Sequence, residues 1–188
     1  MKRIRRSVTD QEYQKLITHT KSDPGIKEHK RLKLLRIFTL LYYTGMRINE
    51  VSLIKIEKIH ELIDQSKGII DTPKKENERE LHFSPAACKS IKLLIKDAAP
   101  EENFIYAWEK KTTPMHKISL IAMVNTYMKQ VLGQGYTSHS FRQGIITDMF
   151  AAGLSTPMVQ KFIGHSDPKT TLHYAAPTSA QVHNALIR

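Results

Sequence analysis

Six side chains whose types suit chemistry on a charged substrate fall in four short motifs. They are Arg47 in YTGMRINE, Lys74 in TPKKENER, His139 and Arg142 in HSFRQG, and His165 and Tyr174 in GHSDPKTTLHY. Cationic groups bind anions, histidine and lysine also move protons, and a phenol can act as a nucleophile. Lysine and arginine exceed aspartate and glutamate by 29 to 18, a formal net charge of +11. This excess favours a polyanionic partner, nucleic acid first and an anionic membrane second.

Each motif taken by itself also has an ordinary structural explanation. An arginine after a helix end, such as Arg47, is usually solvated or caps the helix, and Lys74 fits a charged turn. His139 and Arg142 are three residues apart, so they share one helix face and can pair with a carboxylate. Tyr174 fits a packed core aromatic. A functional interpretation therefore depends on all four motifs together.

The motifs, in this order and at this spacing, resemble the catalytic domain of the tyrosine recombinases, also called the phage integrase family. TGMRINEV is similar to the family's first arginine box, HSFR to its histidine-x-x-arginine box, and IGHSDPKTTLHY to its glycine-histidine box. TPKKENERELHF resembles the hairpin of the catalytic lysine, with Lys74 five residues before Arg79. Lys75 is the alternative, one register step away. The resemblance covers about residues 8–177.

The resemblance implies a phosphate clamp that needs no metal and no other cofactor. Arg47 and Arg142 would hold the non-bridging oxygens of a phosphodiester through their planar guanidinium groups. His165 would donate a further hydrogen bond to the same phosphate. Glu50 lies three residues after Arg47, and we expect it to aim the Arg47 guanidinium through an ion pair rather than to act as an acid or base.

The resemblance also implies covalent catalysis. Tyr174 would attack phosphorus to give a 3′-phosphotyrosine and a free 5′-hydroxyl, with His139 assisting removal of the phenol proton. Lys74 would protonate the departing 5′-oxygen as a general acid. A zinc site made by His139, His165 and His173 is the alternative for the histidines, but the sequence lacks a HExxH or cysteine-rich pattern.

The expected domain organisation is one catalytic domain over residues 1–188, without the N-terminal helical domain that most family members carry. The chain is then either a piece of a longer protein or a short single-domain member. The segment 178–188 has an apolar face that either packs on a neighbouring subunit or returns to its own core. The resemblance implies double-stranded DNA as the partner, a homotetramer on that DNA, and accessory proteins that bend DNA.

Periodicity predicts an α+β fold that is mainly helical with a small antiparallel sheet. A capping box at Thr9 and Glu12 begins the first helix, and Gly45 ends the second. A hairpin is expected from residues 69–72 and 80–83, and a short strand in NFIYAW. The other expected helices are RINEVSLIKIEKI, a segment begun by Ser84 and Pro85 and stopped by Pro100, and then 117–133, 140–152, 156–163, 168–174 and 178–187.

Cellular location follows from what the sequence lacks. Cys88 is the single cysteine, so no intrachain disulfide is expected, and it fits a half-buried helix position. No apolar run is long enough for a bilayer, and the N-terminus MKRIRRSVTDQEYQ has no signal-peptide core. We expect a cytoplasmic, nucleoid-associated protein.

Three functions remain as hypotheses. The first is a site-specific DNA recombinase that acts through Tyr174. The second is a nicking and closing enzyme of the type IB topoisomerase kind, which would relax supercoils without joining new partners. The third is a DNA-binding regulator or accessory protein with a vestigial recombinase site.

Overall fold

The computed structural model of the 188-residue chain describes residues 6–71, 78–107 and 111–164. The chain divides between Ile145 and Ile146 into two compact units, and each is described by itself. The first unit holds the helices α1 (Asp10–Ser22), α2 (Glu28–Thr44), α3 (Ile48–Val51), α4 (Ile56–Gln65), α5 (Pro85–Ile95) and α6 (Lys117–Leu132). Its hairpin consists of β1 (Lys67–Asp71) and β2 (Glu78–His82). The mainly helical fold with a small antiparallel sheet is confirmed.

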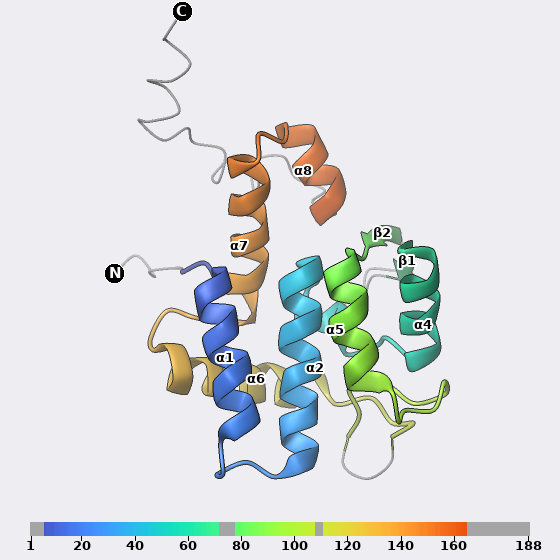
Figure 1. Cartoon of the computed structure of the whole chain (residues 1–188), viewed down its shortest axis with the longest axis vertical. Helices are drawn as coiled ribbons and strands as arrows, with labels where there is room; N and C mark the ends of the chain where they lie inside the picture. Colours follow the sequence, from blue (N-terminus) through green and yellow to red (C-terminus); the bar gives the residue numbers. More distant parts are fainter. Residues whose placement is uncertain (1–5, 72–77, 108–110, 165–188) are drawn as a thin grey trace, which may run out of the picture. The chain divides into compact units, whose positions relative to one another are not determined.

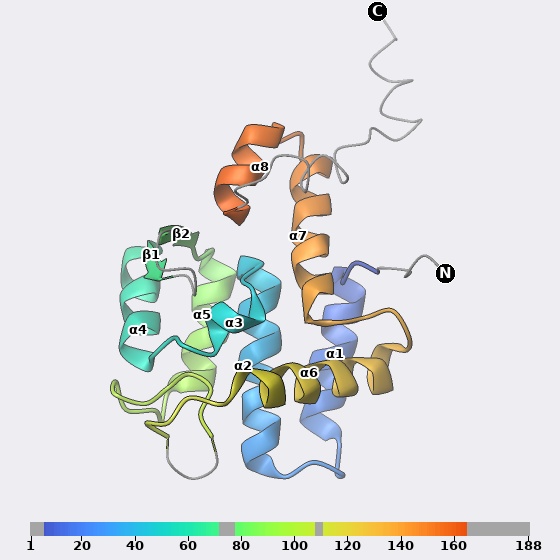
Figure 2. The same ribbon diagram turned by 180° about the vertical axis from the view of Figure 1, so that it is seen from behind.

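Helix α2 forms the centre of the first unit. It lies between α1 and α5 (Figure 1), and α6 crosses α1 and α2 on the other side (Figure 2). Every residue of α2 from Lys33 to Leu41 is buried, so the helix is enclosed by neighbours rather than amphipathic. The Phe38 ring stacks on Tyr127 of α6 at 6.2 Å between ring centroids. The core of the unit is therefore built around this helix.

Local signals in the sequence set the ends of α1 and α2. Thr9 and Glu12 form the expected capping box at the start of α1. The left-handed conformation of Gly45, with φ of 57°, ends α2, and its N–H donates to the Leu41 carbonyl. Glycine reaches this conformation without steric cost, which explains why the helix stops there.

The hairpin is confirmed, with each strand beginning two residues earlier than expected. Its register pairs Ile70 with Arg79 and Gly68 with Leu81. Along β2, residues 79 and 81 are buried and their neighbours are exposed. Arg79 therefore points to the same face of the strand as the core residue Leu81.

Helix α5 ends at Ile95, before the expected stop at Pro100, and two other expected elements differ in kind from the structure. RINEVSLIKIEKI forms two helices, α3 and α4, because residues 53–55 leave the helical path. NFIYAW forms no strand over its described residues 103–107. Phe104 N donates to the Ile54 carbonyl at 2.9 Å, while Ala107 N donates to the Thr113 carbonyl at 2.8 Å. The segment makes single bridges to two different neighbours, so no ladder forms.

Helix α7 (Ser138–Ala151) begins in the first unit. Val8 N donates to the Ser140 carbonyl at 3.0 Å, and Phe141 stacks on Phe38 at 5.9 Å between centroids. A side-chain carbon at Gly144 would meet the Val8 carbonyl oxygen closer than real contacts allow. The start of α7 is therefore packed tightly on the first unit.

The second unit contains the rest of α7 and α8 (Thr156–Ile163). Helix α8 has the bounds expected from the sequence and ends at Gly164, with φ of 66°. The helices expected at 168–174 and 178–187 lie outside the described residues. Across the three described ranges, every helix is too short or too polar to traverse a lipid bilayer.

Candidate active site

The C-terminal end of α2 exposes backbone carbonyls to nearby guanidinium groups. Gly45 turns the chain out of the helix, and the Thr44 side chain folds back to the Leu40 carbonyl at 2.6 Å. The carbonyl groups of Thr44 and Gly45 then have no partner in the next helical turn. Because this is the negative end of the helix dipole, it attracts cations.

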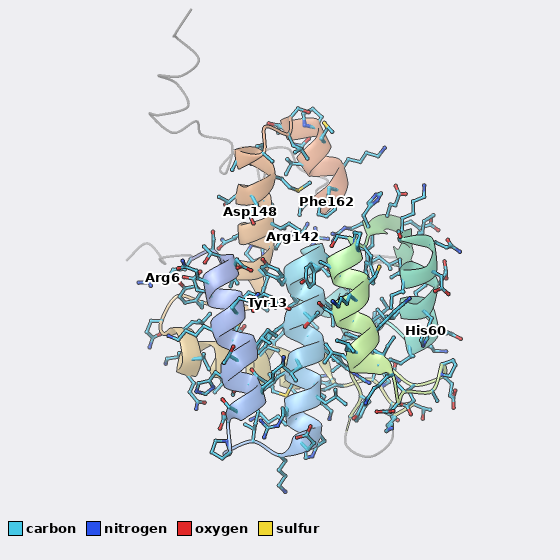
Figure 3. The ribbon with its side chains drawn as sticks, viewed as in Figure 1. Arg6, Tyr13, His60, Arg142, Asp148 and Phe162 are labelled. Carbon is cyan, nitrogen blue, oxygen red and sulfur yellow. The ribbon has the colours of Figure 1, made fainter. Side chains whose placement is uncertain are left out.

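Arg142 reaches this end of α2 from α7. Its Nη1 donates to the Gly45 carbonyl at 2.9 Å, and the residue is only 1% exposed. Figure 3 shows Arg142 beside the end of α2. Phe141, packed on Phe38, fixes the turn of α7 that carries it. This arginine is thus anchored rather than mobile.

Arg47 follows two residues after Gly45 and is the N-cap of α3. Glu50 accepts from the Arg47 backbone N–H at 2.7 Å and from its Nη1 at 2.9 Å. The Glu50 side chain is fully buried, whereas that of Arg47 is 41% exposed. The expected ion pair is present, and it holds both the backbone and the guanidinium of Arg47.

Arg79 of β2 completes the cluster. Its Nη1 donates to Glu50 Oε2 at 3.1 Å and its Nη2 donates to the Thr44 carbonyl at 3.0 Å. Burial lowers the pKa of Arg79 to about 10, with Glu50 acting in the opposite direction and Arg47 adding to the decrease. The side chain is still charged at neutral pH. Sequence reasoning assigned no role to Arg79 beyond its spacing from Lys74; the alternation of β2 was the only signal that it faces inward.

We call Arg47, Glu50, Arg79 and Arg142 the arginine corner. Arg79 and Arg142 donate to the Thr44 and Gly45 carbonyls, and Arg47 and Arg79 share the Glu50 carboxylate. Three positive charges against one negative charge leave the corner strongly cationic. A corner of this kind, with one partly exposed guanidinium, can bind an anion such as a phosphate.

Of the other predicted site residues, only His139 lies within the described part of the structure. His139 lies on α7, three residues before Arg142, and is exposed. Lys74, its alternative Lys75, His165 and Tyr174 lie outside the described residues. The structure thus brings together Arg47, Glu50 and Arg142, and the catalytic roles of all these residues remain predictions. Over the described ranges, no three histidine, cysteine or acidic side chains gather as a metal site would require.

Comparison with protein families matches residues 6–181 to "Phage integrase family". The chain belongs to this family, the tyrosine recombinases. The match spans nearly the whole sequence and includes all four motifs.

Known tyrosine recombinases share both the sequence pattern and the fold. Tyrosine recombinase XerA of Pyrococcus horikoshii is 26% identical over 188 residues, which cover 98% of this chain and 61% of that protein. A crystal structure of XerA recombinase superposes with a TM-score of 0.71 at 17% identity, over 95% of this chain and 61% of that one. XerH site-specific recombinase, in a post-cleavage complex with palindromic difH substrate, gives 0.67 at 17% identity over 95% and 51%. The chain thus spans about three fifths of the XerA protein that it matches.

Proposed function

We propose that this tyrosine recombinase is a site-specific DNA recombinase, which cuts and rejoins DNA strands through a 3′-phosphotyrosine at Tyr174. The observation that carries the proposal is the arginine corner. In it, Arg47 is held by Glu50 just after the end of α2, and Arg142 reaches the same helix end from α7. The order of the four motifs along the chain gives further support.

The corner supplies the charge stabilisation that the reaction needs. A phosphodiester gathers negative charge on its non-bridging oxygens as the transition state forms. Arg47 and Arg142 donate to these oxygens, with His165 as a third donor. Because both guanidinium groups are held by fixed partners, they need little reorganisation, and each such donor is worth about 3 kcal/mol.

The covalent step forms one bond and breaks another. The Tyr174 phenol oxygen bonds to phosphorus while its proton passes to His139. The bond from phosphorus to the 5′-oxygen breaks, and Lys74 gives that oxygen a proton. The phosphotyrosine conserves the phosphodiester bond energy, so a 5′-hydroxyl of another strand can attack it and reseal the DNA without ATP.

The proposal makes double-stranded DNA the partner. The net charge of +11 would provide phosphate contacts along the duplex, and affinity would fall steeply as salt rises. A homotetramer would bring four active sites to two duplexes, and residues 178–188 are the candidate segment for contacts between subunits. DNA-bending proteins would assist the assembly of this complex. Such a partner places the protein at the nucleoid, in the cytoplasm.

The experiment traps the covalent intermediate. A binding site is first selected from a pool of random duplexes and then rebuilt with a nick close to the cleavage position. After cleavage, the short fragment that carries the free 5′-hydroxyl diffuses away, so the strand cannot be resealed. The wild-type chain should form a covalent protein–DNA adduct, and Tyr174→Phe should form none. Tight binding without an adduct would favour the regulator. Supercoil relaxation without joined products would favour the topoisomerase.

A further inference from the structure

Arg79 ends the TPKKENER motif without a catalytic role of its own, yet it makes two hydrogen bonds inside the arginine corner. Its side chain is 2% exposed and that of Glu50 is fully buried. A guanidinium so far from water cannot be explained as surface charge. Its contacts include the Glu50 carboxylate and the Thr44 carbonyl, both of which belong to the segment that positions Arg47.

Glu50 creates an electrostatic difficulty for a phosphate site. Its carboxylate holds Arg47 through two hydrogen bonds, which fixes the direction of the guanidinium. The same carboxylate cancels the positive charge of Arg47 and would repel a phosphate that approaches. With Arg47 alone as its partner, the pair would be neutral. Arg79 is the second cation that binds Glu50. It removes this difficulty, because its positive charge offsets the negative charge of the carboxylate.

We propose that Arg79 is a positioning residue that lets Glu50 orient Arg47 while the group of three stays cationic toward a phosphate. This inference deepens the proposed function and rests on it. It also connects two chain segments, since β2 carries Arg79 and is joined in sequence to residues 72–77, which include Lys74.

A purely structural role is the rival explanation. Arg79 would then only satisfy a buried carboxylate and a helix end, and its loss would act through folding. The two roles differ in one consequence. If charge balance matters, removal of the Glu50 charge should compensate for removal of the Arg79 charge. If only packing matters, the two changes should add or worsen each other.

The test measures phosphate binding at Arg47 in the full chain. Inorganic phosphate is titrated while the ¹⁵N–¹H signal of Arg47 Nε–Hε is followed, in wild type, Arg79→Met, Glu50→Gln and the double variant. We expect Arg79→Met to weaken binding about tenfold, and the double variant to return to within about threefold of wild type. Glu50→Gln should bind phosphate more tightly than wild type yet cleave DNA more slowly, because Arg47 loses its orientation. Lys58→Met, which removes an exposed cation paired with Glu61, is the control for distant charge.

Several results would overturn the inference. They are unchanged phosphate affinity in Arg79→Met, a double variant no better than the single one, or no response of the wild-type Arg47 signal to phosphate. If Arg79→Met fails to fold, the Glu50→Gln variant tests the inference by itself. Phosphate binding by Glu50→Gln that is equal to or weaker than that of wild type would contradict the charge-balance role. Charge-dependent phosphate binding without a DNA adduct would reject the proposed function alone. Equal adduct formation by wild type and Arg79→Met would reject this inference alone.

Discussion

Two regions along α2 bury arginine side chains, and they use them differently. Arg36, in the middle of the helix, donates from Nε to the Leu94 carbonyl at 3.0 Å and from Nη1 to the Phe104 carbonyl at 3.1 Å. Its guanidinium also lies over the Phe104 ring, 5.6 Å from the centroid. At the end of the same helix, the arginine corner adds a buried carboxylate and the partly exposed Arg47.

Burial of a guanidinium is therefore no mark of a functional site in this protein. Burial lowers the pKa of Arg36 as it does that of Arg79. The distinguishing features of the corner are the convergence of two guanidinium groups on one carboxylate and the partial exposure of one of them, Arg47. Arg36 instead joins α5 and the 103–107 segment to α2, which is a task of folding.

The largest expected effect comes from the exposed member of the corner. Arg47→Ala should slow cleavage of the trapped substrate by about 100-fold to 1000-fold, because one donor to the transition-state oxygens is lost. Salt-sensitive DNA binding should change little, since it depends on many phosphate contacts. Single-turnover cleavage and a binding titration measure the two. Cleavage at the wild-type rate would remove Arg47 from the clamp.

Replacing the buried arginine of the other region should act on stability instead. Arg36→Met keeps much of the side-chain volume but leaves the Leu94 and Phe104 carbonyls without this donor, which should cost about 1–3 kcal/mol of unfolding free energy. Urea denaturation measures the loss. Cleavage per folded molecule should stay near the wild-type rate. A cleavage defect as large as that of Arg47→Ala would break the distinction between the regions.

The smallest effect is expected at Glu102, a carboxylate that also pairs with a cation but lies outside the arginine corner. It accepts from Lys111 Nζ at 3.1 Å; the lysine side chain is 47% exposed and that of Glu102 is 13% exposed. Glu102→Gln should change the unfolding free energy by less than about 1 kcal/mol, as for other half-exposed ion pairs, and leave cleavage intact. A clear loss of cleavage would show that the electrostatics of the site extend beyond the corner.

Sequence reasoning succeeded where neighbours in the chain decide the structure. Gly45 as the end of α2 and the Arg47–Glu50 pair involve residues within one helical turn of each other. Arg79 escaped notice because its partner Glu50 is 29 residues away, and only the folded chain brings them together. The same limit explains NFIYAW, whose apolar run fits a strand but whose neighbours offer only single bridges. The contribution of Lys74, His165 and Tyr174 stays a prediction.

The tight fit of Gly144 against the Val8 backbone has a consequence for the arginine corner. Gly144 is two residues from Arg142, so one methyl group added there would push that turn of α7 outward and carry Arg142 away from the Gly45 carbonyl. The absence of a side chain at Gly144 therefore allows Arg142 to contact the Gly45 carbonyl. Engineering of this recombinase should leave that position untouched, even though alanine would ordinarily strengthen a helix.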